Sequence, residues 1–310
     1  MTSLKSVWGV ITAFHPDDLG PAVTRLISQT TGVVVVDDGS GAGAEQQLSV
    51  ARAAGAEVVA LPHNVGIAAA LNVGVRHALA QGADAVVTFD QDSSVPSDFV
   101  KRLRELHDEL SQTAQAPVVV VPQYFASVDQ TVHRGRGAPL SARNAIQSGM
   151  LIPHDVVEKV GFFREELFID LVDTEYALRC EVAGVFAYGV PGLRLEHHLG
   201  GRYRPRGALL RRVGVVTLSS PFRYYYRVRN RTLIEKDYLR HFPARLLRDG
   251  IIDRLHFAFA LLLSRPRRTM WRVLRTGARD GRRGVGGRIP PAEAALARTI
   301  SWRAVLHEDS

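Results

Sequence analysis

The 310-residue sequence has few cysteines, few lysines and no long hydrophobic run. Its one cysteine, Cys180, excludes an intramolecular disulfide and is typical of a reducing compartment. No uninterrupted apolar run reaches about 18 residues, which argues against a transmembrane helix. The first residues lack the long apolar segment of a signal peptide, so none is expected. With 46% hydrophobic residues, the chain suits one large domain or two small ones.

Negative charge is scarce in the last third of the chain. Residues 1–200 contain 14 Lys and Arg against 23 Asp and Glu, a net charge of −9. Residues 201–310 contain 25 against 8, a net charge of +17. Basic regions favour phosphates, nucleic acid or anionic membranes. Because only four of the 39 basic residues are lysines, base composition of the gene can explain the arginine bias, which weakens arguments from arginine number alone.

Two common nucleotide-binding motifs are also missing. A dinucleotide-binding fold needs G-x-G-x-x-G after its first strand, but the first predicted strand ends without glycine at residues 13–16. The turn at residues 39–41 would need a further glycine at Ala44, and no P-loop Lys-Ser pair follows. These absences disfavour hydride transfer and P-loop ATP hydrolysis.

Short apolar runs alternate with helical patterns along the first 121 residues. We expect strands at residues 7–13, 32–37, 57–61, 85–89 and 117–121, and helices at 20–29, 44–54, 67–80 and 96–110. Such alternation predicts an α/β fold, a mainly parallel mixed sheet flanked by helices. Further strands are expected at 148–152, 186–190 and 193–196, helices at 153–160 and 173–183, and basic helices from residue 202, with an apolar stretch at 251–263.

Polar residues follow three of these strands, at His15, at Asp37-Asp38 and at Asp90-Gln91-Asp92. Ligands of parallel sheets bind beyond the carboxyl ends of the strands. Asp90 and Asp92 can share one Mg²⁺ or Mn²⁺, which takes oxygen ligands from carboxylates and from substrate phosphates. The alternative is a polar turn whose serines cap the next helix, and the motif alone does not decide between them.

The order of the motifs resembles glycosyltransferase family 2, the inverting enzymes with a GT-A fold. The motifs lie within residues 7–230, and several of them resemble the bacterial rhamnosyltransferase branch of the family. In chain order they are Asp37-Asp38-Gly39-Ser40, Asn64-Val65-Gly66 with Asn72 downstream, Phe89-Asp90-Gln91-Asp92-Ser93, the base segment at residues 168–179, the His197-x-x-Gly200 metal element, and the run from Tyr225 to Asn230. The resemblance implies a nucleotide-sugar-binding and catalytic domain at residues 1–235. A basic helical region follows at residues 236–310.

Family resemblance also implies roles for individual residues. Asp90, Asp92 and His197 are expected to hold Mn²⁺ or Mg²⁺. Asp38 is expected to accept from N3–H of a uracil or thymine ring, the alternative being that it holds the turn that follows it. The full set expected to bind the nucleotide sugar is Thr12, Phe14, Asp38, Asn64, Gly66, Asn72, Asp90, Gln91 and Arg202. Ordinary alternatives stay open for these positions: strand ends, a helix start at Gly66 capped by Asn64, and a solvated basic loop around Arg202.

Inverting transfer needs a carboxylate that takes the proton of the acceptor hydroxyl. Asp170, Asp173 and Glu175 are the candidates, and the resemblance selects Asp173. The alternative is that Asp173 caps a helix whose dipole Glu175 stabilises, and both roles can coexist. Arg179, four residues after Glu175, is expected to form an ion pair with it.

The expected donor is dTDP-L-rhamnose. UDP-galactofuranose is the alternative, but galactofuranosyltransferases carry an aspartate where this chain has Val172, and Asp-Asp-Asp where it has Asp90-Gln91-Asp92. A rival from another class is a non-catalytic basic protein that binds lipid or nucleic acid.

The resemblance favours a glycan acceptor, free or linked to polyprenyl diphosphate, in the synthesis of cell wall or surface polysaccharide. The basic C-terminal region would then lie on anionic membrane at the inner, cytoplasmic face of the plasma membrane, with no nucleic-acid partner. The apolar stretch at 251–263 leaves a buried helix or a contact between identical subunits open.

Overall fold

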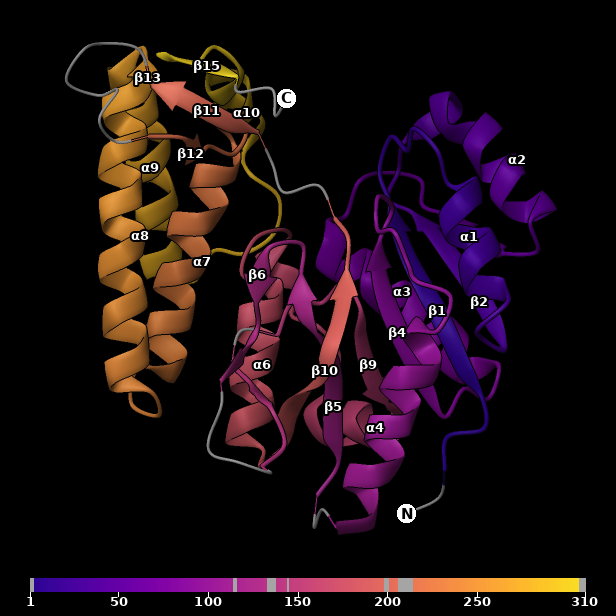
Figure 1. The fold of residues 1–310 in the computed structure, drawn as a ribbon. Helices are drawn as coiled ribbons and strands as arrows, with labels where there is room; N and C mark the ends of the chain where they lie inside the picture. Colours follow the sequence, from indigo (N-terminus) through magenta and orange to yellow (C-terminus); the bar gives the residue numbers. More distant parts are fainter. Residues whose placement is uncertain are drawn as a thin grey trace. The chain divides into compact units, whose positions relative to one another are not determined.

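The computed structural model describes residues 3–113, 116–132, 138–143, 145–197, 201–205 and 214–306. Contacts divide the chain into two compact units, each described by itself below (Figure 1). The first contains Met1–Glu165 and Val172–His198, and the second contains Glu166–Leu171 and Leu199–Ser310. The domain boundary expected between residues 235 and 236 falls inside helix α7 (Arg223–Tyr238), and the roles of the two predicted domains stay predictions.

A mixed sheet forms the centre of the first unit. Among the described residues its strand order is β3-β2-β1-β4-β9-β5-β10-β8-β7, and β6 pairs with β5. Strands β1 to β4 pair with one another in parallel, whereas β9 runs antiparallel between β4 and β5. The predicted α/β fold with a mainly parallel, mixed sheet is therefore confirmed. The strands are β1 (Val7–Ala13), β2 (Gly32–Asp37), β3 (Glu57–Ala60), β4 (Ala85–Asp90), β5 (Val118–Phe125), β6 (Val128–Asp129), β7 (Thr131–Val132), β8 (Ser141–Ala142), β9 (Met150–Pro153) and β10 (Phe186–Leu195).

One strand differs from its prediction. β10 replaces the two strands expected at residues 186–190 and 193–196. Its pairing with β5 shifts register between Val190 and Arg194, at Pro191 and Gly192, the latter with φ of 67°. A turn-forming Pro-Gly pair thus produces a bulge in one strand instead of a break between two. The helices of this unit are α1 (Gly20–Ile27), α2 (Glu45–Ala53), α3 (Ile67–Ala80), α4 (Phe99–Thr113), α5 (His154–Val160) and α6 (Val172–Val182).

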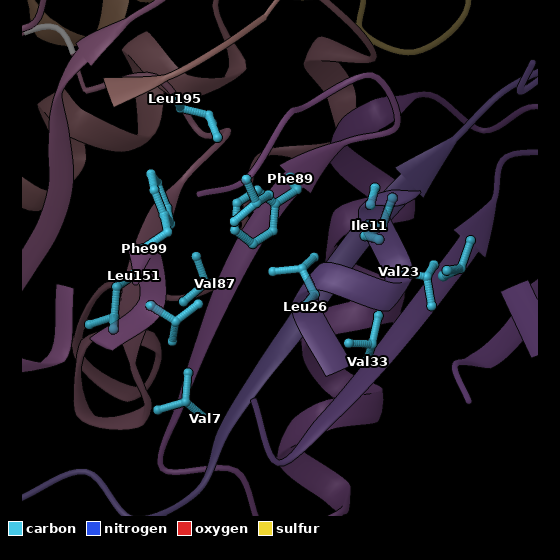
Figure 2. Close-up of a cluster of buried hydrophobic side chains, with 14 of the residues drawn as sticks. Val7, Ile11, Val23, Leu26, Val33, Val87, Phe89, Phe99, Leu151 and Leu195 are labelled. Carbon is cyan, nitrogen blue, oxygen red and sulfur yellow. The ribbon is translucent and has the colours of Figure 1, made fainter. Parts of the chain in front are cut away.

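The main core of this unit lies between the sheet and helices α1 and α4. Ile11 of β1, Val33 of β2 and Phe89 of β4 face Leu26 of α1 and Phe99 of α4 (Figure 2). Alternate residues of a strand point to the same face, so the valine runs also supply apolar side chains to the opposite face. Each such buried side chain contributes about 1.5–3 kcal/mol relative to exposure.

The second unit is mainly helical, with α7 (Arg223–Tyr238), α8 (Pro243–Leu263), α9 (Arg267–Arg283) and α10 (Pro291–Arg298). Residues Tyr224, Tyr225 and Tyr226 pack in its core. The basic helices begin at Arg223 and not at residue 202 as expected, because β11 (Arg202–Pro205) pairs with β12 (Val216–Thr217) and β15 (Ala304–Leu306). A two-stranded pair joins β13 (Ser264–Arg265) to β14 (Ser301–Trp302). Among the helices that the structure describes, none combines the length and apolar character needed to cross a membrane.

Candidate active site

Three strand ends lie side by side at one edge of the sheet. Thr12 of β1 pairs in parallel register with Asp90 of β4, and Ala13 pairs with Asp37 of β2. The side chain of Gln91 accepts the backbone N–H of Phe14 at 2.7 Å, which ties the β1 and β4 ends together. The expected gathering of polar residues at the carboxyl edge is therefore present.

His197 reaches this edge through an isolated bridge between two loops. The backbone N–H of Ser94 donates to the carbonyl of Glu196 at 3.0 Å. The next residue, His197, packs its ring on Phe125, with centroids 4.7 Å apart. Its Nδ1 lies 3.2 Å from Asp92 Oδ1. Residues about a hundred positions apart in sequence are thus brought together.

Asp90, Asp92 and His197 form a group that fits a divalent cation. One ligand atom of each lies within 4.8 Å of the other two. His197 Nδ1 is buried, and no group in the described ranges pairs with it in hydrogen-bonding geometry, although Asp92 is close. Two carboxylates and one imidazole suit Mn²⁺ or Mg²⁺, and the imidazole favours Mn²⁺. The structure thus places the predicted metal ligands together.

Burial and mutual charge shift the pKa values of Asp90 and His197 in this group. Burial raises the pKa of Asp90 to about 6, with further upward contributions from Asp92 and Asp173. The charges and hydrogen bonds of His197 and Gln147 act in the opposite direction. Burial lowers the pKa of His197, but its contact with Asp92 and the charge of Asp90 outweigh it, so that the net pKa is raised. A dication would favour the unprotonated form of all three groups.

Two neighbours of Asp90 were not expected from the sequence. The Gln147 amide nitrogen donates to Asp90 Oδ1 at 2.6 Å, and the Asp90 backbone N–H donates to Ser148 Oγ at 3.1 Å. Ser148 also contacts Ser93 Oγ at 2.8 Å. The sequence signal was limited to a strand start at 148–152, because nothing local in it indicates a partner 57 residues away.

The two aspartates at the end of β2 divide the structural work. Asp37 holds the following turn, since its carboxylate accepts from the N–H and the hydroxyl of Ser40. Asp38 accepts the backbone N–H groups of Val65 at 2.6 Å and Gly66 at 3.0 Å. These bonds tie Asp38 to the loop before α3, and the alternative offered for it, holding the Gly39-Ser40 turn, stays open. Its predicted contact with a pyrimidine ring stays a prediction.

Gly39 is needed where this turn approaches the next loop. Its φ is 73°, and a Cβ atom there would lie 2.2 Å from the backbone carbon of His63. Asn64 follows His63, and its buried Oδ1 has no hydrogen-bond partner within the described ranges. Gly66, with φ of 94°, is the N-cap of α3, and no side chain caps it, so the capping alternative for Asn64 is wrong. The Asn64 side chain is thus a candidate contact for the nucleotide.

Asn72 lies away from the strand ends. It is fully buried, and its amide nitrogen donates to the carbonyl of Phe163 and to Glu165, both at 2.8 Å. Its Oδ1 accepts the N–H of Phe163 at 2.9 Å. All these bonds hold the loop before α6 against α3. The structure therefore gives Asn72 a structural role, and the nucleotide contact expected for it would require these bonds to open.

The three candidate bases have different surroundings. Asp170 pairs with Arg223 through two bonds of 2.7 and 3.1 Å. Glu175 is buried and pairs with Arg179 as expected, at 3.0 and 3.1 Å. Asp173 is half-buried in the first turn of α6, accepts the N–H of Thr174 at 2.7 Å, and is close enough to Asp90 to raise its pKa. Among the three, Asp173 acts electrostatically on the metal group.

The roles predicted for Arg202 and Gly200 are not tested by the structure of the first unit. Arg202 begins β11 in the second unit, where its side chain is exposed, and its expected contact with the donor diphosphate stays a prediction. Gly200, the last residue of the predicted His-x-x-Gly element, lies outside the described residues.

Comparisons with known proteins agree with the site. Residues 9–171 match the sequence profile of "Glycosyl transferase family 2". The chain is 29% identical over 298 residues to "dTDP-rhamnosyl transferase RfbF" of Shigella flexneri, covering 91% of this chain and 97% of that protein. The crystal structure of S. aureus TarS 1-349 aligns with a TM-score of 0.52 at 15% identity, covering 94% of this chain and 83% of that one. That likeness concerns the fold alone, and it agrees with the predicted GT-A architecture. The chain belongs to glycosyl transferase family 2 and is a glycosyltransferase.

Proposed function

We propose that the chain transfers L-rhamnose from dTDP-L-rhamnose to an acceptor hydroxyl, with inversion at the anomeric carbon. The observation that carries the proposal is the similarity to a dTDP-rhamnosyl transferase along nearly the whole of both chains. The carboxylates and histidine at the sheet edge agree with a donor that carries a diphosphate. Membership of an enzyme family removes the reason to keep the non-catalytic alternative.

In this reaction Asp173 takes the proton of the acceptor hydroxyl as the acceptor oxygen forms a bond to the anomeric carbon. The bond from that carbon to the diphosphate oxygen breaks, and dTDP leaves with the electron pair. Asp38 and Asn64, beside the strand ends, are assigned to the base and ribose, with Thr12 and Phe14. Gly66 brings backbone close to the donor at a helix N-terminus, which favours phosphate.

Asp90, Asp92 and His197 hold Mn²⁺ or Mg²⁺ in this proposal. When bound, the cation supplies positive charge that stabilises the diphosphate as a leaving group. Gln147 and Ser148 fix Asp90 for this purpose, because each binds a different atom of that residue. Gln91 fixes the backbone of Phe14, at the start of the loop expected to line the nucleotide.

The donor is tested by a thermal-shift panel with Mn²⁺ and single sugar nucleotides. We expect dTDP-rhamnose, at about 100 times its Kd, to raise the melting temperature by several degrees. UDP-galactofuranose should give no comparable shift, and dTDP alone serves as the control for the nucleotide part. A larger shift with UDP-galactofuranose would replace the rhamnose assignment, and no shift with any nucleotide would remove the donor proposal.

For the acceptor we propose a glycan on a lipid carrier, reached from the inner, cytoplasmic face of the plasma membrane. An exposed apolar face on α8 supports this location. Leu247, Ile251 and Leu255 follow one another at intervals of four residues and are 55, 57 and 67% exposed. Ile252 and Leu262 extend the same face. Exposed apolar surface of this extent is unusual on a soluble monomer and suits a membrane interface.

Charge on α9 agrees with an anionic surface. Arg268, Arg272 and Arg275 are exposed, and Trp271 beside them is 57% exposed. Arginine is attracted to anionic headgroups, and tryptophan prefers the boundary between headgroups and acyl chains. A peripheral contact with anionic lipid therefore uses both helices.

Replacing Ile251 and Leu255 together by glutamine should lower cosedimentation with phosphatidylglycerol vesicles several-fold, because the two most exposed turns of the α8 face lose their apolar side chains. Phe186→Gln, which removes an exposed aromatic side chain from the first unit, is the matched control and should sediment like the wild type. Unchanged sedimentation of the double variant would remove the α8 membrane contact.

A further inference from the structure

A short segment with unusual backbone conformation precedes the proposed base. Phe168, Asp170 and Leu171 have φ of 64, 66 and 60°. Residues with a Cβ atom rarely adopt this left-handed conformation, and three of them within four positions need surrounding groups to hold them. The chain then enters α6 at Val172, and Asp173 is the second residue of that helix. This segment therefore leads directly into the first turn of α6, where Asp173 lies.

Asn230 of α7 binds the backbone of this segment. Its side-chain amide nitrogen donates to the carbonyl oxygens of Leu167 at 2.9 Å, Ile169 at 2.8 Å and Asp170 at 2.7 Å. Asn230 is fully buried. The two N–H groups of one amide thus serve three carbonyl groups of this irregular segment, with one N–H shared between two of them.

Arg229 supports Asn230 from the adjacent position. Its Nε donates to Asn230 Oδ1 at 2.9 Å, which fixes the direction of the amide nitrogen. The same guanidinium donates to the carbonyl oxygens of Glu166 at 3.0 Å and Leu167 at 2.8 Å. Arg229 is also fully buried. These bonds define one end of the segment.

Two further residues of α7 hold the side chains of the segment. The ring of Phe168 stacks on Tyr226 at 5.1 Å between centroids and 6° between planes. Asp170 pairs with Arg223 at 2.7 and 3.1 Å. Residue 226 is three or four positions from each of 223, 229 and 230, so the four side chains lie toward one side of the helix. That face of α7 is used to bind residues 166–170.

We propose that Asn230 is a positioning residue for the catalytic base: it holds the left-handed segment and so fixes the backbone conformation with which the chain enters α6, whose second residue is Asp173. This inference rests on the proposed function, in which Asp173 accepts the acceptor proton. It gives a role to the run from Tyr225 to Asn230, which donor and metal binding leave unexplained. Catalysis is sensitive to such placement, since a shift of about 1 Å can cost on the order of 10²-fold in rate.

The test is Asn230→Ala, with turnover measured as dTDP release from dTDP-rhamnose and a lipid extract of the native host as acceptor. We expect kcat to fall by about 10²-fold while the KM for the donor and the Mn²⁺ affinity stay at wild-type values. Hydrogen exchange of peptides covering residues 166–173 should become faster, and that of α9 should not. Tyr224→Phe is the matched control: it removes a hydroxyl of the same helix that contacts His256 Nε2 at 3.2 Å, and that hydroxyl makes none of the bonds to the segment described above.

Wild-type kcat in folded Asn230→Ala would overturn the inference, as would an equal loss of kcat in Tyr224→Phe. If Asn230→Ala does not fold, Arg223→Gln decides, because its side chain is 39% exposed and its loss removes the Asp170 pair from the segment. A fall in kcat at unchanged donor KM would then support the inference, and unchanged kcat would overturn it. Asp173→Asn separates the two proposals: an inactive Asp173→Asn with a fully active Asn230→Ala removes the positioning role alone.

Discussion

Asp173→Asn is expected to lower kcat by about 10² to 10⁴-fold, because an amide cannot take the proton of the acceptor hydroxyl. Donor binding should survive, since the change keeps the shape of the side chain. Mn²⁺ binding should be retained or somewhat weaker, because Asp173 carries a negative charge close enough to Asp90 to raise its pKa, and that charge also attracts a dication. Turnover is measured as dTDP release, and donor affinity by thermal shift, both with the same folded protein.

Glu175→Gln is the matched control for this variant. It makes the same chemical change two residues further along α6, in a buried carboxylate that pairs with Arg179. We expect a loss of stability there, because one partner of a part-buried ion pair is removed, with turnover per folded molecule retained. Near wild-type turnover of Asp173→Asn would eliminate Asp173 as the base. If Glu175→Gln is folded but has no transfer activity, Glu175 would be assigned as the base instead.

Asp90→Asn should abolish Mn²⁺ binding and transfer, and at the same time stabilise the protein in EDTA. Burial disfavours the charge of Asp90 and raises its pKa in the folded protein to about 6, from an ordinary value of 3.8. The ionised carboxylate therefore costs up to about 3 kcal/mol of folding free energy above pH 6, which the neutral amide avoids. Asparagine keeps an oxygen that can accept from Gln147.

The stabilisation expected for Asp90→Asn should depend on pH in a defined direction. A carboxyl group whose pKa is higher in the folded state destabilises the fold as pH rises. For Asp90 the cost should be absent below pH 3.8, grow up to about pH 6, and stay constant above it. Unfolding in EDTA at pH 8 and at pH 4 measures the difference between variant and wild type. Exposed Asp98→Asn is the control and should change neither stability nor Mn²⁺ binding.

If Asp90→Asn were less stable than the wild type at pH 8, that would contradict the claim that burial disfavours the charge of Asp90. Retained Mn²⁺ binding would contradict its role as a ligand. The two readouts are separate, so each part of the account can fail alone.

Local sequence was sufficient for much of the first unit. The valine-rich strands at residues 7–13 and 32–37 and the helix at 67–80 have the predicted bounds, because burial on both faces and helical spacing are local patterns. β10 was split in prediction because Pro191 and Gly192 indicate a turn, whereas pairing with β5 continues past them. Pairing across the sheet is a tertiary effect that a local pattern does not contain.

For the site, too, local sequence did not reveal partners that are distant along the chain. Asp90, Asp92 and His197 were predicted together from their motifs, and the structure brings them together. Asn72 was assigned to the nucleotide by family resemblance, but its partners, at residues 163 and 165, are more than 90 positions away. The sequence around Asn72 contains no signal that indicates such distant partners. The three contacts of Asn230 were missed for the same reason.

Anomalous scattering at the Mn edge, from crystals grown with MnCl₂ and dTDP, tests the central claim most directly. The account predicts one strong peak within coordination distance of Asp90, Asp92 and His197 and of the diphosphate oxygens, and no peak there in Asp90→Asn crystals. A peak elsewhere, or a well-ordered dTDP whose diphosphate lies away from these three side chains, would contradict it.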